Sequence, residues 1–187
     1  MIALFRKKVQ ASEVGEQLCE RAREERRAGY PQAATLLLPT PEMDVMAVRN
    51  EWLYLEIFRI DLAVRLAFGG GVEKSAILTA FWSGVKNWLL QQVVAPLAER
   101  RILLDGHSKI VPPENEEKSY SRLKRRLQLY SECSHVRHPL GEGLWIAATF
   151  IGLCGTPDGA PLGEITSRFT SSRDELARQL KSERIVV

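Results

Sequence analysis

The sequence predicts an all-α fold, a single helical domain over residues 1–187 built as an irregular bundle of five to seven helices. Two observations support the helical fold, and a third adds a small β element to it. The apolar segments 43–68 and 72–101 are joined by three glycines, as in a helical hairpin. Residues 140–155 are apolar almost all round, which is typical of a helix buried on every side. An Asp-Gly pair between the apolar runs of 102–111 predicts one small β-hairpin.

The N-terminal part predicts a cover helix. Residues 1–11 are expected to form a flexible basic arm, after which Ser12 can cap a helix that ends near Gly29. Its charge run RAREERR is mixed in sign, which favours a solvated face. Prolines at 31, 39 and 41 then predict a linker over 30–41.

Segment 43–68 is expected to be the central helix, because it carries two apolar stripes and therefore needs two partners. One stripe is Val45, Val48, Trp52, Leu55, Leu62 and Leu66. The other is Met46, Leu53, Ile57, Ile60 and Val64. The second central helix is expected at 140–153.

A charged seam lies between these stripes and consists of Arg49, Glu56 and Arg59. One interpretation is a structural ion pair that fixes how neighbouring helices dock. The alternative is a ligand-binding site for an anion beside Trp52, since two guanidiniums around one carboxylate leave net positive charge.

The glycines at 69–71 permit a tight reversal into the next helix, over 72–101. A phosphate-binding loop at these glycines is disfavoured, because no preceding strand and no Lys-Ser/Thr ending accompanies them. Pro96 is expected to kink or end the helix.

The helix expected after Asn115 carries a concentrated positive face. Its members are Lys118, Arg122, Lys124, Arg125 and Arg126. One interpretation is a solvated face balanced by nearby glutamates, and the other is a docking surface for an acidic partner or for phosphates.

A candidate metal site follows, made of Cys133, His135 and His138, with Cys154 as a further ligand. These residues lack the paired spacing of structural zinc sites. The alternative is a helix end, where His135 favourably meets the negative end of the dipole.

The C-terminal residues 162–187 predict two short helices, the second opened by a capping box at Ser172–Glu175. Their outline is that of a weak helix-turn-helix, with basic residues between Arg173 and Arg184 facing a duplex. The alternative is a helical hairpin that covers the buried helix.

Composition bounds the function. A net charge of +3 is too small to indicate a nucleic-acid partner by itself, and no apolar run approaches the length of a membrane span. Three cysteines without paired spacing and no visible export signal predict a cytoplasmic protein.

No catalytic grouping and no cofactor motif can be assembled, so an enzyme is disfavoured. The preferred hypothesis is a non-enzymatic protein–protein interaction module that uses the basic helix face. The alternatives are a bundle that binds a small anionic ligand and a weak DNA-binding protein. Neither the partner nor the oligomeric state follows from the sequence.

Overall fold

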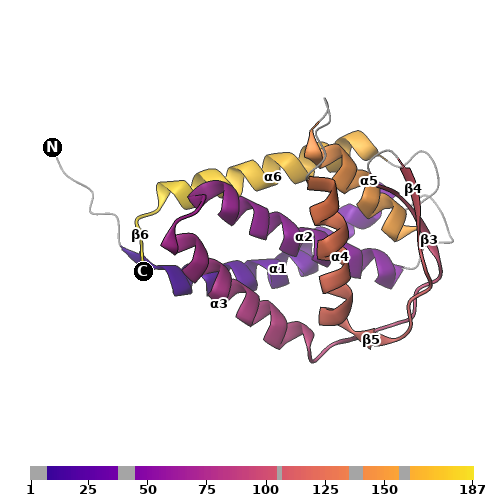
Figure 1. The fold of residues 1–187 in the computed structure, drawn as a ribbon, viewed down its shortest axis with the longest axis horizontal. Coiled ribbons are helices and arrows are strands. Elements are labelled where there is room, and N and C mark those ends of the chain that lie inside the picture. The colour runs from indigo at the N-terminus through magenta and orange to yellow at the C-terminus, as the bar shows by residue number, and fades with distance from the viewer. Residues whose placement is uncertain (1–7, 38–44, 105–106, 135–140, 156–160) are drawn as a thin grey trace.

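The computed structural model describes residues 8–37, 45–104, 107–134, 141–155 and 161–187. It confirms a mostly helical fold with a small β element. The described helices are α1 (Ala11–Leu37), α2 (Val45–Phe68), α3 (Val72–Leu89), α4 (Ser119–Ser134), α5 (Glu142–Cys154) and α6 (Leu162–Ser182). Figure 1 shows α4 crossing the other helices at a steep angle, so the bundle is irregular.

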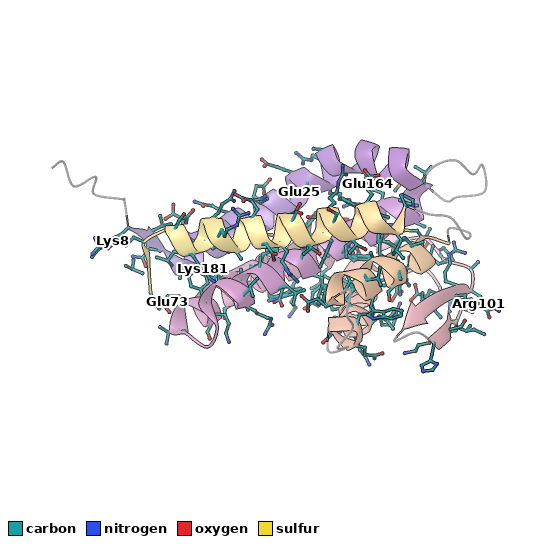
Figure 2. The ribbon with its side chains drawn as sticks, turned by 90° about the horizontal axis from the view of Figure 1, so that it is seen from above. Lys8, Glu25, Glu73, Arg101, Glu164 and Lys181 are labelled. Carbon is teal, nitrogen blue, oxygen red and sulfur yellow. The ribbon has the colours of Figure 1, made fainter. Side chains whose placement is uncertain are left out.

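The described strands are short and form three pairs, two between segments distant in sequence and one hairpin. The strands β1 (Val9–Gln10) and β6 (Ile185–Val186) pair in parallel, so Lys8 lies at the same end of the molecule as Lys181 of α6 (Figure 2). The strands β2 (Val93–Val94) and β5 (Glu117–Lys118) pair antiparallel below α4. The strands β3 (Arg100–Leu104) and β4 (His107–Val111) form the predicted hairpin.

Helix α2 is the centre of the fold and contacts every other helix. Its two apolar stripes enter two separate hydrophobic cores, as the periodicity predicts. Leu53, Ile57 and Ile60 belong to the core shared with α1, α3 and the second half of α6. Val48, Trp52 and Leu55 belong to the core shared with α4, α5, the hairpin and the first half of α6. The outermost stripe members Val45, Met46 and Leu66 are exposed.

The hairpin is held by close backbone contact with α5. A Cβ on Gly152 would lie 2.6 Å from the carbonyl oxygen of Arg101 and 2.9 Å from Cα of Ile102. Only glycine permits this approach, which seats Ile102 in the second core and fixes β3 on α5. Strand β4 is linked to α4 by an ion pair of 3.3 Å between Lys109 and Glu132.

Several predicted boundaries are wrong. Helix α1 continues through Gly29 and Pro31 to Leu37, so the linker expected over 30–41 is helical as far as the described residues reach. A proline removes only one helical hydrogen bond, which a long helix can accommodate. Helix α3 ends at Leu89, well before Pro96, because residues 93–94 pair with β5 instead.

The two ends of the chain also differ from expectation. Helix α6 is one continuous helix across Thr170 and Ser171, so the helix-turn-helix outline is wrong. The capping box at Ser172 lies inside this helix, where tertiary packing of Phe169 and Leu176 overrides a local start signal. At the N-terminus, Val9–Gln10 pair with β6, so the predicted arm is shorter.

Candidate functional site

The basic face of α4 is the first candidate site, and the structure divides it. Arg122 and Arg126 are each only 1% exposed, whereas Lys118, Lys124 and Arg125 are exposed. The expectation of five side chains on one positive surface is therefore wrong for two of them. Arg122 and Arg126 lie at helical spacing with buried Leu123 and Tyr130, so they turn inward with the apolar face.

Arg126 is held between two carboxylates from different parts of the chain. Its Nε donates to both carboxylate oxygens of Glu51 on α2, at 2.8 and 2.9 Å. Its two terminal nitrogens donate to the two oxygens of Glu114, at 2.9 and 2.6 Å. Such paired hydrogen bonds between ions are strong and fix orientation, so Arg126 ties α4 to α2 and to the segment before β5.

Arg122 and Arg125 extend the same cluster. Arg122 Nε lies 3.2 Å from Glu114 and 3.2 Å from Glu117, and its Nη2 donates to the backbone carbonyl of Ala95 at 2.9 Å. Arg125 forms ion pairs with both glutamates from the outside. We call Glu51, Glu114, Glu117, Arg122, Arg125 and Arg126 the α4 charge cluster. It contains three carboxylates and three guanidiniums and is therefore balanced.

Whether each side chain of this cluster is ionised depends on two opposing effects, its burial and its pairing with an opposite charge. Burial raises the pKa of Glu51, which Arg126 only partly offsets. Burial also opposes ionisation of Glu114, but the hydrogen bond and charge of Arg126 outweigh it and lower the pKa of Glu114. The pKa of Arg126 is raised, because its two carboxylate partners outweigh its burial. Removing one partner would leave a buried charge uncompensated.

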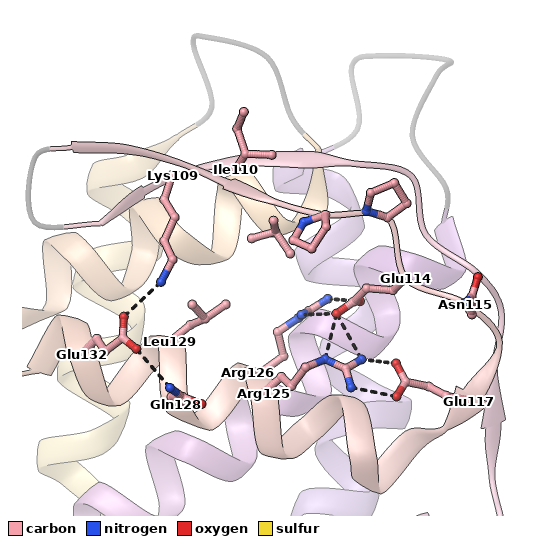
Figure 3. Close-up of a pocket in the computed structure, with 13 residues that line it drawn as sticks. Lys109, Ile110, Glu114, Asn115, Glu117, Arg125, Arg126, Gln128, Leu129 and Glu132 are labelled. Atoms are coloured by element: carbon pink, nitrogen blue, oxygen red, sulfur yellow. Dashed lines mark hydrogen bonds and ion pairs between the residues drawn. The ribbon is translucent and has the colours of Figure 1, made fainter.

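A groove of about 500 Å³ lies beside this cluster, between α4 and the segment 109–117 (Figure 3). Arg125, Arg126 and Glu114 line one end. At the other end Lys109 forms an ion pair of 3.3 Å with Glu132. The wall between the two ends is apolar and comes from Ile110, Val111, Pro112, Pro113 and Leu129. We call this the α4 groove.

The charges of the α4 groove are layered. Arg125 is 47% exposed, while its partners Glu114 and Glu117 are 8% and 19% exposed. Lys109 is likewise more exposed than Glu132. Arg125 is therefore the outer member of its ion pairs, whereas Lys109 and Glu132 are both exposed at the groove surface. An approaching partner meets positive charge first, although the pairs are neutral as a whole.

The seam on α2 is the second candidate site. Arg59 Nε and Nη2 both donate to Glu56, at 2.8 and 2.5 Å, and Nη2 also lies 3.3 Å from Glu25 on α1. Its Nη1 donates to the carbonyl of Ser172 at 3.1 Å. Burial raises the pKa of Glu56 to about 7, with Glu25 adding to it and Arg59 opposing it. Arg59 thus joins α1, α2 and α6.

The structure does not gather the seam into one site. Trp52 is buried in the second core, where it meets Phe150 edge-on at 5.7 Å. Arg49 also lies near Arg26 of α1, where burial and the charge of Arg49 lower the pKa of Arg26. The contacts of Arg59 match the structural interpretation, in which an ion pair fixes helix docking.

The candidate metal site is described only in part. Cys133 is buried and its Sγ lies 3.1 Å from Oγ1 of Thr149, while His135 and His138 lie outside the described residues. Burial raises the pKa values of Cys19, Cys133 and Cys154, which favours the thiol over the nucleophilic thiolate. Within the described ranges, no three His, Cys, Asp or Glu side chains gather in a way that could hold a metal ion.

Sequence reasoning missed the carboxylates that complete these clusters. Glu51 is fully buried and lies on α2, and Glu25 lies on α1 in the run assigned to solvent. A signal was available for Glu25. The apolar strip of α1 ends at Ala22, and positions three and four residues later are Glu25 and Arg26. If the apolar strip of α1 is extended by one helical turn, Glu25 and Arg26 lie on its inward face.

Comparison of the chain with protein-family models, with curated proteins and with solved structures finds no match. Among the described helices, none combines the length and apolar character that crossing a bilayer requires.

Proposed function

We propose that this chain is a non-enzymatic interaction module that binds an extended, acidic segment of a partner protein in the α4 groove. The observation that supports this most is the layering of charge at Arg125, which is 47% exposed above Glu114 and Glu117, at 8% and 19%, with exposed Lys109 at the other end of the groove. Charge complementarity of this kind steers a partner of opposite sign and fixes its orientation.

The shape of the groove favours an extended segment. Strand β4 pairs with β3 on one edge, and no described strand pairs with its other edge. An unpaired strand edge is a template for an incoming strand, whose alternate side chains then enter neighbouring pockets. Ile110, which is 54% exposed, and the two prolines give apolar contact area beside this edge.

Selection from a phage-displayed random peptide library tests the proposal. We expect the immobilised protein to enrich peptides that combine acidic and apolar residues. The variant Lys109→Gln/Arg125→Gln, which removes two cations that line the groove, should bind those peptides at least about tenfold more weakly, since each lost ionic hydrogen bond is typically worth a factor of ten or more.

The matched control is Arg178→Gln/Lys181→Gln on α6, which removes the same charge from another exposed face. It should bind the selected peptides like the natural chain. Failure to enrich any peptide family, or equal loss in both double variants, would contradict a specific site in the α4 groove.

The DNA-binding alternative loses its geometric basis, because α6 is a single helix without a turn. Two of its basic residues also form ion pairs within the chain, Arg173 with Glu142 and Asp174, and Arg178 with Glu175. We therefore do not propose it.

A further inference from the structure

A second, smaller pocket lies on the other side of α4, between α1, α2 and the segment 92–97. It encloses about 230 Å³ and is lined by Arg26, Asn50, Gln92 and Arg122 together with apolar side chains. No carboxylate is among the described residues that line it. The α4 groove has three carboxylates for three cations, so the two pockets differ in charge.

The excess charge comes from Arg26. Within the described part of the chain, its polar contacts are with two amides: Nη1 donates to Oε1 of Gln92 at 2.7 Å, and Nη2 donates to Oδ1 of Asn50 at 3.4 Å. None of the ion pairs between described residues includes it. Arg122 also lines the pocket, but Glu114 and Glu117 already balance its charge.

These contacts fix the polarity of the lining. A guanidinium has only donors, so Gln92 and Asn50 must turn their oxygens to Arg26, and their NH₂ groups point elsewhere. Nε of Arg26 is itself buried without a hydrogen-bond partner in the structure. The side chains around this pocket therefore have donors left over and need acceptors. A bound anion with several oxygens supplies both the missing acceptors and a negative charge for Arg26.

The rest of the lining is apolar. Val94 and Leu97 are buried walls, while Met46 and Val93 are 50% and 54% exposed. Exposed apolar side chains next to an enclosed positive pocket favour a ligand with an apolar part, because such a part removes them from water.

We propose that the pocket formed by Arg26, Asn50, Gln92 and Arg122 binds a small organic oxoanion, a carboxylate or phosphate group attached to a short apolar body. The oxoanion lies against the guanidinium of Arg26, and the apolar body contacts Met46, Val93 and Leu97. This site is separate from the α4 groove and does not depend on the function proposed for it.

Trp88 provides a direct readout. The guanidinium of Arg26 lies 5.8 Å from its ring centroid, so a ligand at Arg26 shifts the indole N–H resonance of Trp88 in a nitrogen-proton NMR spectrum. The probes are benzoate, phenyl phosphate, inorganic phosphate and the neutral benzamide. We expect saturable shifts with benzoate or phenyl phosphate, and the one that binds more tightly identifies the anionic group. Inorganic phosphate should bind more weakly, and benzamide should cause no saturable shift.

Two variants locate the site, and one serves as the control. Arg26→Gln should weaken binding about tenfold or more. Gln92→Glu supplies Arg26 with a carboxylate from the chain itself, so it should also abolish binding while leaving the fold intact. Arg23→Gln is the control, since Arg23 lies 5.1 Å from the Trp88 centroid but does not line the pocket.

Three results would overturn the proposal. One is no saturable shift of Trp88 with either organic anion up to its solubility limit. Another is equal loss in Arg23→Gln and Gln92→Glu. The third is equal affinity for benzoate and benzamide, which would show that charge does not matter.

Discussion

The α4 charge cluster and the pocket at Arg26 share Arg122 but differ in how their arginines are balanced. In the cluster, Arg126 meets Glu51 and Glu114 from the same chain, and every guanidinium has a carboxylate. In the pocket, the hydrogen bonds of Arg26 to described residues go to two amides, and its guanidinium lies 5.8 Å from the ring centroid of Trp88. Arg126 is buried and Arg26 is half-buried, and the two regions differ in whether the chain itself supplies a carboxylate to the guanidinium.

This difference separates structural charges from available ones. A buried ion that finds its partner within the chain serves to dock helices, and its hydrogen-bonding capacity is used up. An ion whose partners are neutral keeps its capacity for a ligand. The positive face of α4 looked available in the sequence and is mostly used internally, whereas Arg26 looked like part of a solvated run.

The largest loss of stability should follow from removing one charge of the balanced α4 charge cluster. Glu51→Leu leaves Arg126 with one carboxylate fewer in a site without solvent, and we expect a loss of about 3–5 kcal/mol in unfolding free energy. Urea denaturation measures it. The double variant Glu51→Leu/Arg126→Met should lose less than the single one, because no excess positive charge remains. A double variant that loses the sum of both single losses would contradict this coupling.

The next effect concerns the group formed by Glu25, Glu56 and Arg59, which has two carboxylates for one guanidinium. Glu56 has a pKa of about 7 in the folded chain against 4.5 as its ordinary value, so the folded state holds an extra proton between them. Its contribution to stability therefore falls as pH rises from about 5 to 8, by roughly 1–3 kcal/mol. The lowered pKa of Glu25 acts below this window.

Glu56→Gln keeps the shape of the protonated side chain and should remove that fall. Urea denaturation of both proteins at about pH 5 and pH 8 checks it. Parallel changes in the natural chain and the variant would assign the pH dependence to another group.

A smaller effect should follow at Arg125, the exposed neighbour of Arg126. Arg125→Gln removes ion pairs that are half in solvent, which typically contribute no more than about 1 kcal/mol. Thermal denaturation at low and high salt measures it, and the loss should shrink with added salt. A salt-independent loss as large as that of Glu51→Leu would place Arg125 in the structural part of the cluster.

Periodicity predicted the helices well, because α2 and α5 are defined by long apolar patterns that the cores then use. Boundaries failed where a tertiary contact overrode a local signal. Residues 93–94 pair with β5 rather than extend α3, and Phe169 and Leu176 pack along one helix across Ser172.

The sites were harder to predict, since charge alone does not say which way a side chain turns. Arg122 and Arg126 were visible as a pair four residues apart, and Glu114 and Glu117 lie close to them in the sequence, but Glu51 lies 75 residues from Arg126. The environment of Arg26 depends on how α1 meets α2 and on where residue 92 returns. Both contacts join segments that are far apart in the sequence, so a local pattern cannot predict them.

The distinction between the structural charge of Arg126 and the available charge of Arg26 is tested most directly by their Met variants. The unfolding free energies of Arg126→Met and Arg26→Met are measured side by side by urea denaturation. We expect Arg126→Met to lose about 3–5 kcal/mol, because it strands Glu51 and Glu114, and Arg26→Met to stay within about 1 kcal/mol of the natural chain. Equal losses would show that Arg26 is as much a structural charge as Arg126, and the distinction between the two regions would fail.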